Sequence, residues 1–210
     1  MNEDPINESS QKEFLNLLHA RHGHFRLESG HHGNLWLELD QLFLRPKDIG
    51  PFVIELAHKI SAFEIDAICG PMVGGALVAQ SIAVELGVEF FYTERVMPQN
   101  PDALYSATYH LPDRLHKMIG GKHVAIVDDV INAGSAVRGT LTELQSFGAI
   151  PVVIGSLLVL GETGKKYFSE RNLPLRSISR LPNEIWTPED CPLCAQGLPL
   201  HAPGSSLLKT

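Results

Sequence analysis

The sequence predicts an α/β fold in which a parallel, twisted sheet is covered by helices on both faces. Short apolar strands alternate with amphipathic helices through the middle of the chain, which is typical of such a sheet. Gly87 and Gly148 follow expected helices, at the place where a left-handed residue commonly ends one. The length of 210 residues suits one domain, or one domain with a small cap.

A short helix is expected over residues 11–21, and two alternating apolar runs around the turn residues Ser29 to Asn34 predict a hairpin. A helix is expected from about Asp48 to Phe63, where apolar residues recur at helical spacing. The part that follows predicts strands at 66–70, 88–93, 104–111, 123–128 and 151–161, and helices at 74–87 and 135–148.

We expect one domain, residues 1–210, with three parts. Residues 1–45 form the N-terminal helix and hairpin, residues 46–180 form the α/β core, and residues 181–210 form a C-terminal tail. The last 30 residues are rich in Pro and Leu, which indicates an extended arm or cap.

Composition and charge exclude several classes of function. The net charge of −7 argues against a general nucleic-acid binder, which needs a basic face. The chain has no apolar run of 18 residues, so no membrane span is expected. Its first residues are acidic and polar and do not resemble a secretory signal. With three cysteines and no such signal, a reducing, cytoplasmic compartment is expected.

One stretch, "HVAIVDDVINAGSAVRGT", carries the chemistry. Asp128 and Asp129 leave an apolar strand at its carboxyl end, where ligands bind in open parallel sheets. A turn of small residues, with Gly134, then leads into a helix whose N-terminus suits a phosphate. The acids would accept hydrogen bonds from sugar hydroxyls or lie near a metal, so the stretch offers places for both halves of a sugar phosphate. They could also merely cap the helix.

The same stretch resembles the phosphoribosyl-pyrophosphate (PRPP) signature of type I phosphoribosyltransferases. Within that superfamily it looks most like the orotate phosphoribosyltransferases, whose turn often holds the pair "AG". "GHFRLESGHHGNLWLELD" resembles their N-terminal hood, with Trp36 as the aromatic that packs on the base. "FYTER" resembles the strand whose last arginine, here Arg95, meets pyrophosphate. "CPLCAQGLPLHAPGS" looks like a tail found in some bacterial enzymes of this type.

The resemblance implies a type I phosphoribosyltransferase fold, with the hood built from the N-terminal segment and the C-terminal tail. It implies Mg²⁺-assisted transfer of ribose 5-phosphate from PRPP to a nucleobase, most simply orotate to orotidine monophosphate in UMP biosynthesis, by a homodimer. Asp128, Asp129 and Arg95 would be catalytic, with Mg²⁺ carried on PRPP near the two acids. "CGPMVGGALVA" resembles the pyrophosphate loop, with a cis peptide near Met72–Val73. That loop is Pro71, Met72, Val73, Gly74 and Gly75, and the loop for the 5-phosphate is Asn132, Ala133, Gly134, Ser135 and Ala136.

Three departures from the orotate pattern keep other functions open. Glu28 and Gly74 stand where the family usually has lysines, in the hood and in the pyrophosphate loop. Between Arg95 and Arg114 the chain has no Lys or Arg, whereas the family carries a cationic lid there; His110 is the one candidate cation. The alternatives are transfer to a purine or another base, and a PRPP-sensing regulator without catalysis.

Several residues have a plainer interpretation as well. Trp36 could pack in the core, and Arg95 could form a surface ion pair. The histidines of "ESGHHG", and His19, His22 and His24, are interpreted as solvated. Cys191 and Cys194 form a lone C-x-x-C motif, and we favour two structural thiols that hold the tail. Zinc needs four ligands, and His201 alone lies near in sequence, with Cys69 far away.

Overall fold

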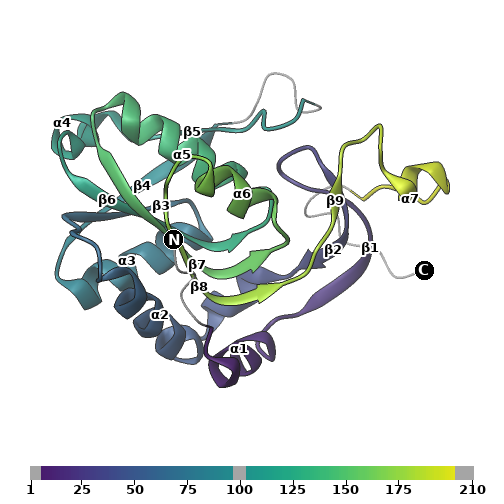
Figure 1. Ribbon diagram of the computed structural model, residues 1–210, viewed down its shortest axis with the longest axis horizontal. Helices are drawn as coiled ribbons and strands as arrows, with labels where there is room; N and C mark the ends of the chain where they lie inside the picture. The colour runs from purple at the N-terminus through teal and green to yellow at the C-terminus, as the bar shows by residue number, and fades with distance from the viewer. Residues whose placement is uncertain (1–5, 97–102, 202–210) are drawn as a thin grey trace.

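A computed structural model describes residues 6–96 and 103–201 (Figure 1). Its main sheet has the strand order β5-β4-β3-β6-β7-β8. All neighbouring strands are parallel except β4 and β5, which are antiparallel. The strands are β3 (Ala67–Pro71), β4 (Glu89–Val96), β5 (Thr108–His110), β6 (His123–Ile131), β7 (Ile150–Leu160) and β8 (Leu175–Leu181). The predicted parallel sheet is confirmed.

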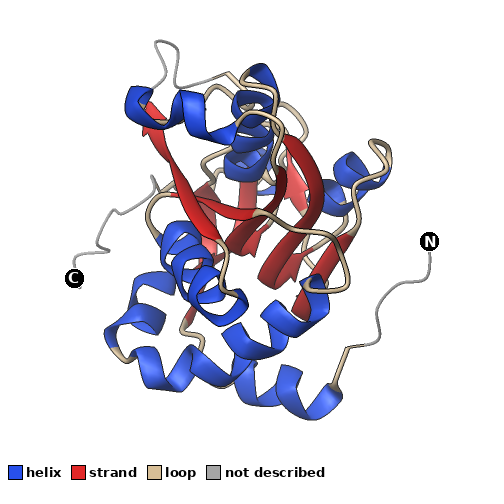
Figure 2. Ribbon diagram, turned by 90° about the vertical axis from the view of Figure 1, so that its left-hand side faces the viewer, coloured by secondary structure: helices blue, strands red, loops and turns tan. Residues whose placement is uncertain are grey.

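Helices cover both faces of this sheet, as Figure 2 shows. On one face α1 (Glu8–Leu15), α2 (Pro46–Ile60) and α3 (Gly74–Leu86) bury Phe14, Leu56 and Ile82 in a common core. On the other face α4 (His116–Ile119), α5 (Ser135–Ser146) and α6 (Thr163–Ser169) bury Ile119, Leu144 and Phe168. Strands buried on both faces read as continuous apolar runs, which is why the sequence indicated them.

A second, three-stranded sheet lies to the right of the main sheet in Figure 1. The predicted hairpin forms its first two strands, β1 (Ala20–Arg26) and β2 (His32–Leu37), which pair antiparallel. β9 (Ile185–Trp186) pairs with β2 from the far end of the chain and is followed by α7 (Pro192–Ala195). We call the sheet β1-β2-β9 together with α7 the hood.

The structure corrects the expected N-terminal helix. The helix spans Glu8–Leu15, because Asn7 caps it by accepting from the amides of Ser9 and Ser10, and Asn16 ends it. The residues from Ala20 onward form β1, whose pairing with β2 outweighs the weak helical pattern. The sequence prediction also omitted the 3₁₀ turns Leu39–Leu44 (η1) and Asp113–Leu115 (η2), and α4, α6, β8, β9 and α7.

Two further predictions concern the glycines that end helices and the absence of a membrane span. Gly87 and Gly148 adopt positive φ after α3 and α5, as predicted. No helix within the described residues has the length and apolar character needed to cross a bilayer.

Candidate functional site

A pocket lies between the hood and the carboxyl ends of the central strands β3 and β6. Every residue that the sequence singled out for PRPP or the base lines this pocket. These are Trp36, Pro71, Met72, Val73, Gly74, Gly75, Arg95, Asp128, Asp129, Asn132, Ala133, Gly134, Ser135 and Ala136. The chain therefore brings together four segments that are far apart in sequence.

The two acids sit on β6 in a setting that disfavours their charge. Asp128 is 7% exposed, and its Oδ1 accepts from the Asp129 amide at 3.0 Å. Asp129 is partly buried, and its Oδ1 accepts from the Val130 amide at 2.9 Å. Burial, and then the neighbouring Asp129 carboxylate, raise the pKa of Asp128 well above its ordinary value. Burial also raises the pKa of Asp129. Such a pair is suited to sugar hydroxyls or a cation.

The pyrophosphate loop, residues 71–75, lies in close contact with these acids. A Cβ on Gly74 would lie 2.2 Å from Asp129 Oδ2, and a Cβ on Gly75 would lie 2.6 Å from Asp128 Oδ1. Both distances are far below van der Waals contact, so a side chain at either position would displace a carboxylate of the acid pair or, at Gly75, the Pro71 ring. The peptide bond Met72–Val73 is cis, as the resemblance implied.

The small-residue turn leads into the N-terminus of α5. Gly134 precedes the helix with φ of 80°, a left-handed conformation that favours glycine. Within this helix the Arg138 amide donates to the Gly134 carbonyl at 2.8 Å, so the amides of 135–137 precede the hydrogen-bonded ladder. These amides and the helix dipole favour an anion such as a phosphate.

Glu28, Tyr109 and Arg95 join the hood to the core. Arg95 on β4 is the register partner of Tyr109 on β5. Tyr109 donates its hydroxyl to Glu28 Oε1 at 2.7 Å, and Arg95 Nη1 lies 4.0 Å from Glu28 Oε2. Burial and the Glu28 carboxylate raise the pKa of the Tyr109 hydroxyl. Sequence reasoning missed Tyr109, whose signal was only a tyrosine in a short expected strand.

Charge in the pocket is mostly negative. Among its described lining residues Arg95 alone has a cationic side chain, against the five acids Glu28, Glu38, Asp40, Asp128 and Asp129. His110 lies 3.4 Å from Glu143 Oε2 and is not among the lining residues described. The resemblance placed a lid after Arg95, and residues 97–102 of that segment lie outside the described residues.

Trp36 and Arg95 also make the contacts that the alternative interpretations predicted, namely packing for Trp36 and an ion pair for Arg95. Trp36 is half-buried on β2 and its ring lies 6.0 Å from that of Phe25, so it both packs and lines the pocket. Arg95 forms an ion pair, but with Glu28 inside the pocket rather than at a remote surface.

The interpretation of several histidines as solvated was wrong. His24, His31 and His32 are buried, with exposed fractions of 3%, 8% and 5%. The C-terminal tail covers His24 and His32, since His201 accepts from the Arg26 amide and donates its own amide to the His24 carbonyl. His31 lies instead against Ser29 and the Tyr105 ring. His19 and His22 are exposed, as expected.

Comparison with known proteins supports the family. The family profile described as "Phosphoribosyl transferase domain" matches residues 47–194. The orotate phosphoribosyltransferase of Caldanaerobacter subterraneus subsp. tengcongensis is 31% identical over 186 residues, covering 89% of this chain and 90% of the relative. That of Thermotoga maritima is 30% identical over 187 residues, covering 89% of this chain and 92% of the relative.

Solved structures support the fold. A crystal structure of orotate phosphoribosyltransferase from Aeropyrum pernix has a TM-score of 0.59 at 19% identity, covering 83% of this chain and 92% of that one. One of adenine phosphoribosyltransferase from Rhodothermus marinus has a TM-score of 0.66 at 16% identity, covering 83% and 100%. At such identities the likeness concerns the fold alone. With the profile and the curated relatives, it places the chain in the phosphoribosyltransferase family, as a pentosyltransferase similar to the orotate phosphoribosyltransferases.

Proposed function

We propose that this enzyme transfers ribose 5-phosphate from PRPP to orotate, forming orotidine monophosphate and pyrophosphate in pyrimidine biosynthesis. The observation that carries the proposal is the joint location of the two acids, the two loops, Arg95 and Trp36 in one pocket. Relatives that share about 90% of their length with this chain bear the name orotate phosphoribosyltransferase. We further propose that the three parts 1–45, 46–180 and 181–210 act as one domain, in a cytoplasmic homodimer.

In this proposal each end of PRPP meets a different part of the pocket. The amides of residues 133–136, at the N-terminus of α5, bind the 5-phosphate, because that helix end offers N–H donors and a partial positive charge. The backbone of residues 71–75 faces the leaving pyrophosphate, and Arg95 neutralises part of its charge. Trp36, across the pocket on the hood, stacks on the base.

The two aspartates bind the ribose. Their carboxylates accept hydrogen bonds from the ribose hydroxyls and stabilise the positive charge that develops at C1 as pyrophosphate departs. A ring nitrogen of the base attacks C1 as the bond to pyrophosphate oxygen breaks. Holding both reactants in line supplies much of the rate, because positioning removes an entropic cost. Orotate needs no strong general base, because its ring nitrogen is acidic.

The residues fit a magnesium ion brought in with PRPP. Asp128 and Asp129 offer adjacent carboxylate oxygens, the hard donors that Mg²⁺ prefers, at the end of the pocket where the sugar would lie. When bound, the ion would offset charge on pyrophosphate and on the ribose hydroxyls.

The acidic lining favours a second candidate acceptor. Glu28 lines the pocket at the position where the orotate pattern has a lysine, and a carboxylate there suits a neutral or cationic base such as a purine better than anionic orotate. The two candidates share the whole PRPP site and differ only in the base.

The test is a substrate panel. In the presence of PRPP and Mg²⁺, the purified protein is expected to convert orotate, which is followed by the loss of its absorbance. One pyrophosphate should be released for each orotate consumed. Faster turnover with adenine, hypoxanthine or uracil would assign the second candidate. PRPP binding by calorimetry without turnover of any base would overturn the proposed transfer reaction and leave only binding.

A further inference from the structure

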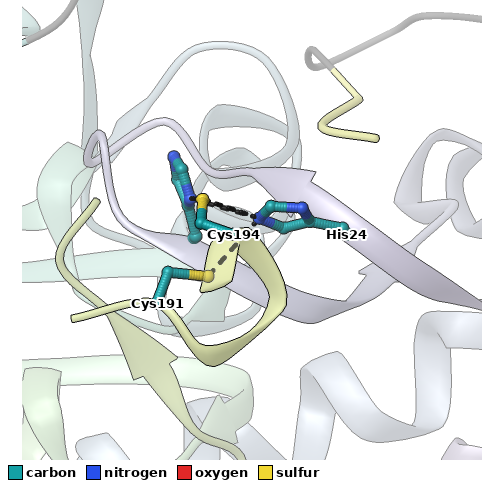
Figure 3. Close-up of side chains that lie close together, drawn as sticks. His24, Cys191 and Cys194 are labelled. Atoms are coloured by element: carbon teal, nitrogen blue, oxygen red, sulfur yellow. Dashed lines mark hydrogen bonds between the residues drawn. The ribbon is translucent and has the colours of Figure 1, made fainter. Parts of the chain in front are cut away.

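A cluster of two histidines and two cysteines lies in the hood, apart from the residues that line the pocket. His24, His32, Cys191 and Cys194 each direct one potential ligand atom to a common point, and these atoms lie within 4.8 Å of one another. Figure 3 shows both sulfur atoms, from α7 and the residue before it, facing the His24 ring on β1. Among the described residues this is the one group of metal-ligand side chains gathered in this way.

Four of the six distances between these ligand atoms come close to the edges of a zinc tetrahedron, and the other two, from Cys191 Sγ to Cys194 Sγ and to His32 Nδ1, are at most 4.8 Å. Zn–S bonds of about 2.3 Å and Zn–N bonds of about 2.0–2.1 Å place ligand atoms roughly 3.3–3.8 Å apart at tetrahedral angles. His24 Nε2 lies 3.4 Å from Cys191 Sγ and 3.7 Å from Cys194 Sγ. His32 Nδ1 lies 3.2 Å from both Cys194 Sγ and His24 Nε2. Two nitrogens and two sulfurs are the ligands of a structural zinc site.

A hydrogen bond orients the His24 ring for coordination. Its Nδ1 lies 2.9 Å from the Leu198 carbonyl oxygen, which can only accept, so Nδ1 carries the proton. In the neutral ring Nε2 then has a free lone pair, and that lone pair faces the two sulfurs and His32. A backbone carbonyl on the far nitrogen is the usual partner of a zinc-binding histidine.

The local fold explains how these residues meet. The register of β1 on β2 shifts between His22 and Phe25, so β1 contains an extra residue there, as in a β-bulge that redirects a side chain. His32 is the register partner of Trp186 on β9, and β9 leads the chain directly to Cys191. His201, the nearby histidine in sequence, instead pairs its backbone with Phe25 and places its ring 5.9 Å from that of Phe25.

We propose that His24 Nε2, His32 Nδ1, Cys191 Sγ and Cys194 Sγ bind one structural Zn²⁺ that joins the C-terminal tail to the hood hairpin. On binding, both thiols lose their protons to solvent, so the two thiolates balance the charge of the ion. Four protein ligands leave no open position, so the site is structural rather than catalytic. The ion would fix the turn end of the hairpin whose other residues, Glu28 and Trp36, line the pocket.

The first test is the metal content of the full-length protein, purified under reducing conditions without chelator. We expect about one zinc per chain, released when a mercurial reagent titrates the thiols. The metal-free protein should take up Co²⁺ and show the visible and thiolate charge-transfer bands of a tetrahedral site. Protein with free thiols but no zinc, and without these bands on adding Co²⁺, would refute the site; so would a disulfide between Cys191 and Cys194.

The second test uses variants with a matched control. Cys191→Ser with Cys194→Ser is expected to lower zinc to below about a tenth of an equivalent, because two ligands are lost. His22→Gln, an exposed histidine on the same strand, should keep the full equivalent. Zinc retained in the double cysteine variant would overturn the proposal. If that variant does not fold, the measurements on the unmodified protein still decide.

A third measurement reports on the hood itself. Both tryptophans of the chain, Trp36 and Trp186, lie in the hood strands β2 and β9. Removing zinc should therefore shift tryptophan emission to longer wavelength, as these rings gain water, and adding zinc back should reverse the shift. Emission that is unchanged while zinc leaves would contradict the structural role. None of these measurements depends on the acceptor base or on turnover.

Discussion

The pocket and the hood cluster are two places where this chain gathers groups that bind cations, and they differ in chemistry and in closure. The pocket offers carboxylate oxygens on an open cleft, and the burial that raises the pKa of Asp128 leaves that charge poorly compensated. The cluster offers nitrogen and sulfur atoms around a closed point. Hard oxygen donors suit an ion that comes and goes with a substrate, whereas a closed N/S set suits a resident ion.

The largest expected effect tests the pocket half of this comparison. Asp128→Asn together with Asp129→Asn should lower the transfer rate by at least about 10²–10³, because two charge-stabilising groups are lost. PRPP affinity should fall as well, measured by calorimetry with Mg²⁺. Asp113→Asn, an exposed acid remote from the pocket, is the control and should change neither. Unchanged PRPP affinity in the double variant would contradict the assignment of the two acids to the ribose site.

The next effect concerns the contact between the pyrophosphate loop and the acids. Gly74→Ala should lower turnover by up to about 10², since a Cβ 2.2 Å from Asp129 Oδ2 forces the carboxylate or the loop to move, and displacements near 1 Å are that costly. The matched control is Gly50→Ala in α2, where an added Cβ meets nothing within 4 Å. There a gain in stability of up to about 1 kcal/mol is expected. Normal kinetics in Gly74→Ala would show that the loop is not held as described.

Sequence reasoning anticipated the pocket better than the cluster, and the reason is locality. The strand, acids, turn and helix of residues 123–140 follow one another, so one continuous stretch specifies Asp128, Gly134 and their relation. The cluster depends on β9 pairing with β2, which brings Cys191 beside His24 across more than 160 residues. Alternating apolar residues predict a strand, but they do not predict which partner it takes. Tyr109 was missed for the same reason, since its role follows from the β4–β5 register with Arg95.

A third prediction concerns the pH dependence of stability, because the buried, ionised carboxylates of the pocket destabilise the folded protein. The raised pKa of Asp128 means that, above the ordinary carboxyl range, the folded ligand-free protein holds more protons than the unfolded chain. Stability therefore falls as pH rises from that range towards the raised pKa. Asp128→Asn should raise the Tm at pH 7 and reduce this fall, by about 2–4 °C for each kcal/mol regained.

The measurement is thermal unfolding of both proteins without ligand, from pH 4 to pH 8. Their difference reports the coupled pair Asp128 and Asp129, because the histidines titrate in both proteins. A Tm at pH 7 that is equal or lower in Asp128→Asn would mean that this carboxylate is not destabilising in the folded state. PRPP with Mg²⁺ should stabilise the unmodified protein more as pH rises, since the ionised acids are the binding form.

The smallest expected effect lies where the two regions meet, at Glu28 between hood and core. Its carboxylate lies 4.0 Å from Arg95, the residue proposed to bind pyrophosphate. Both side chains are more than a third exposed. Glu28→Gln keeps an acceptor for the Tyr109 hydroxyl but removes the charge. Partly exposed ion pairs contribute about 0.2–1 kcal/mol, so PRPP should bind more tightly by no more than about fivefold, and less so at high salt.

Tyr109→Phe distinguishes the effect of the Glu28 charge from the effect of the hydrogen bond between Tyr109 and Glu28. It removes the hydrogen bond to Glu28 Oε1 and leaves the carboxylate in place, so it should loosen the hood without tightening PRPP binding. If both variants tighten PRPP equally, the hood restrains Arg95 through the Tyr109 contact rather than through charge. If Glu28→Gln alone does so, competition between Glu28 and pyrophosphate for Arg95 is the cause, and the hood acts on the pocket through the charge of Glu28.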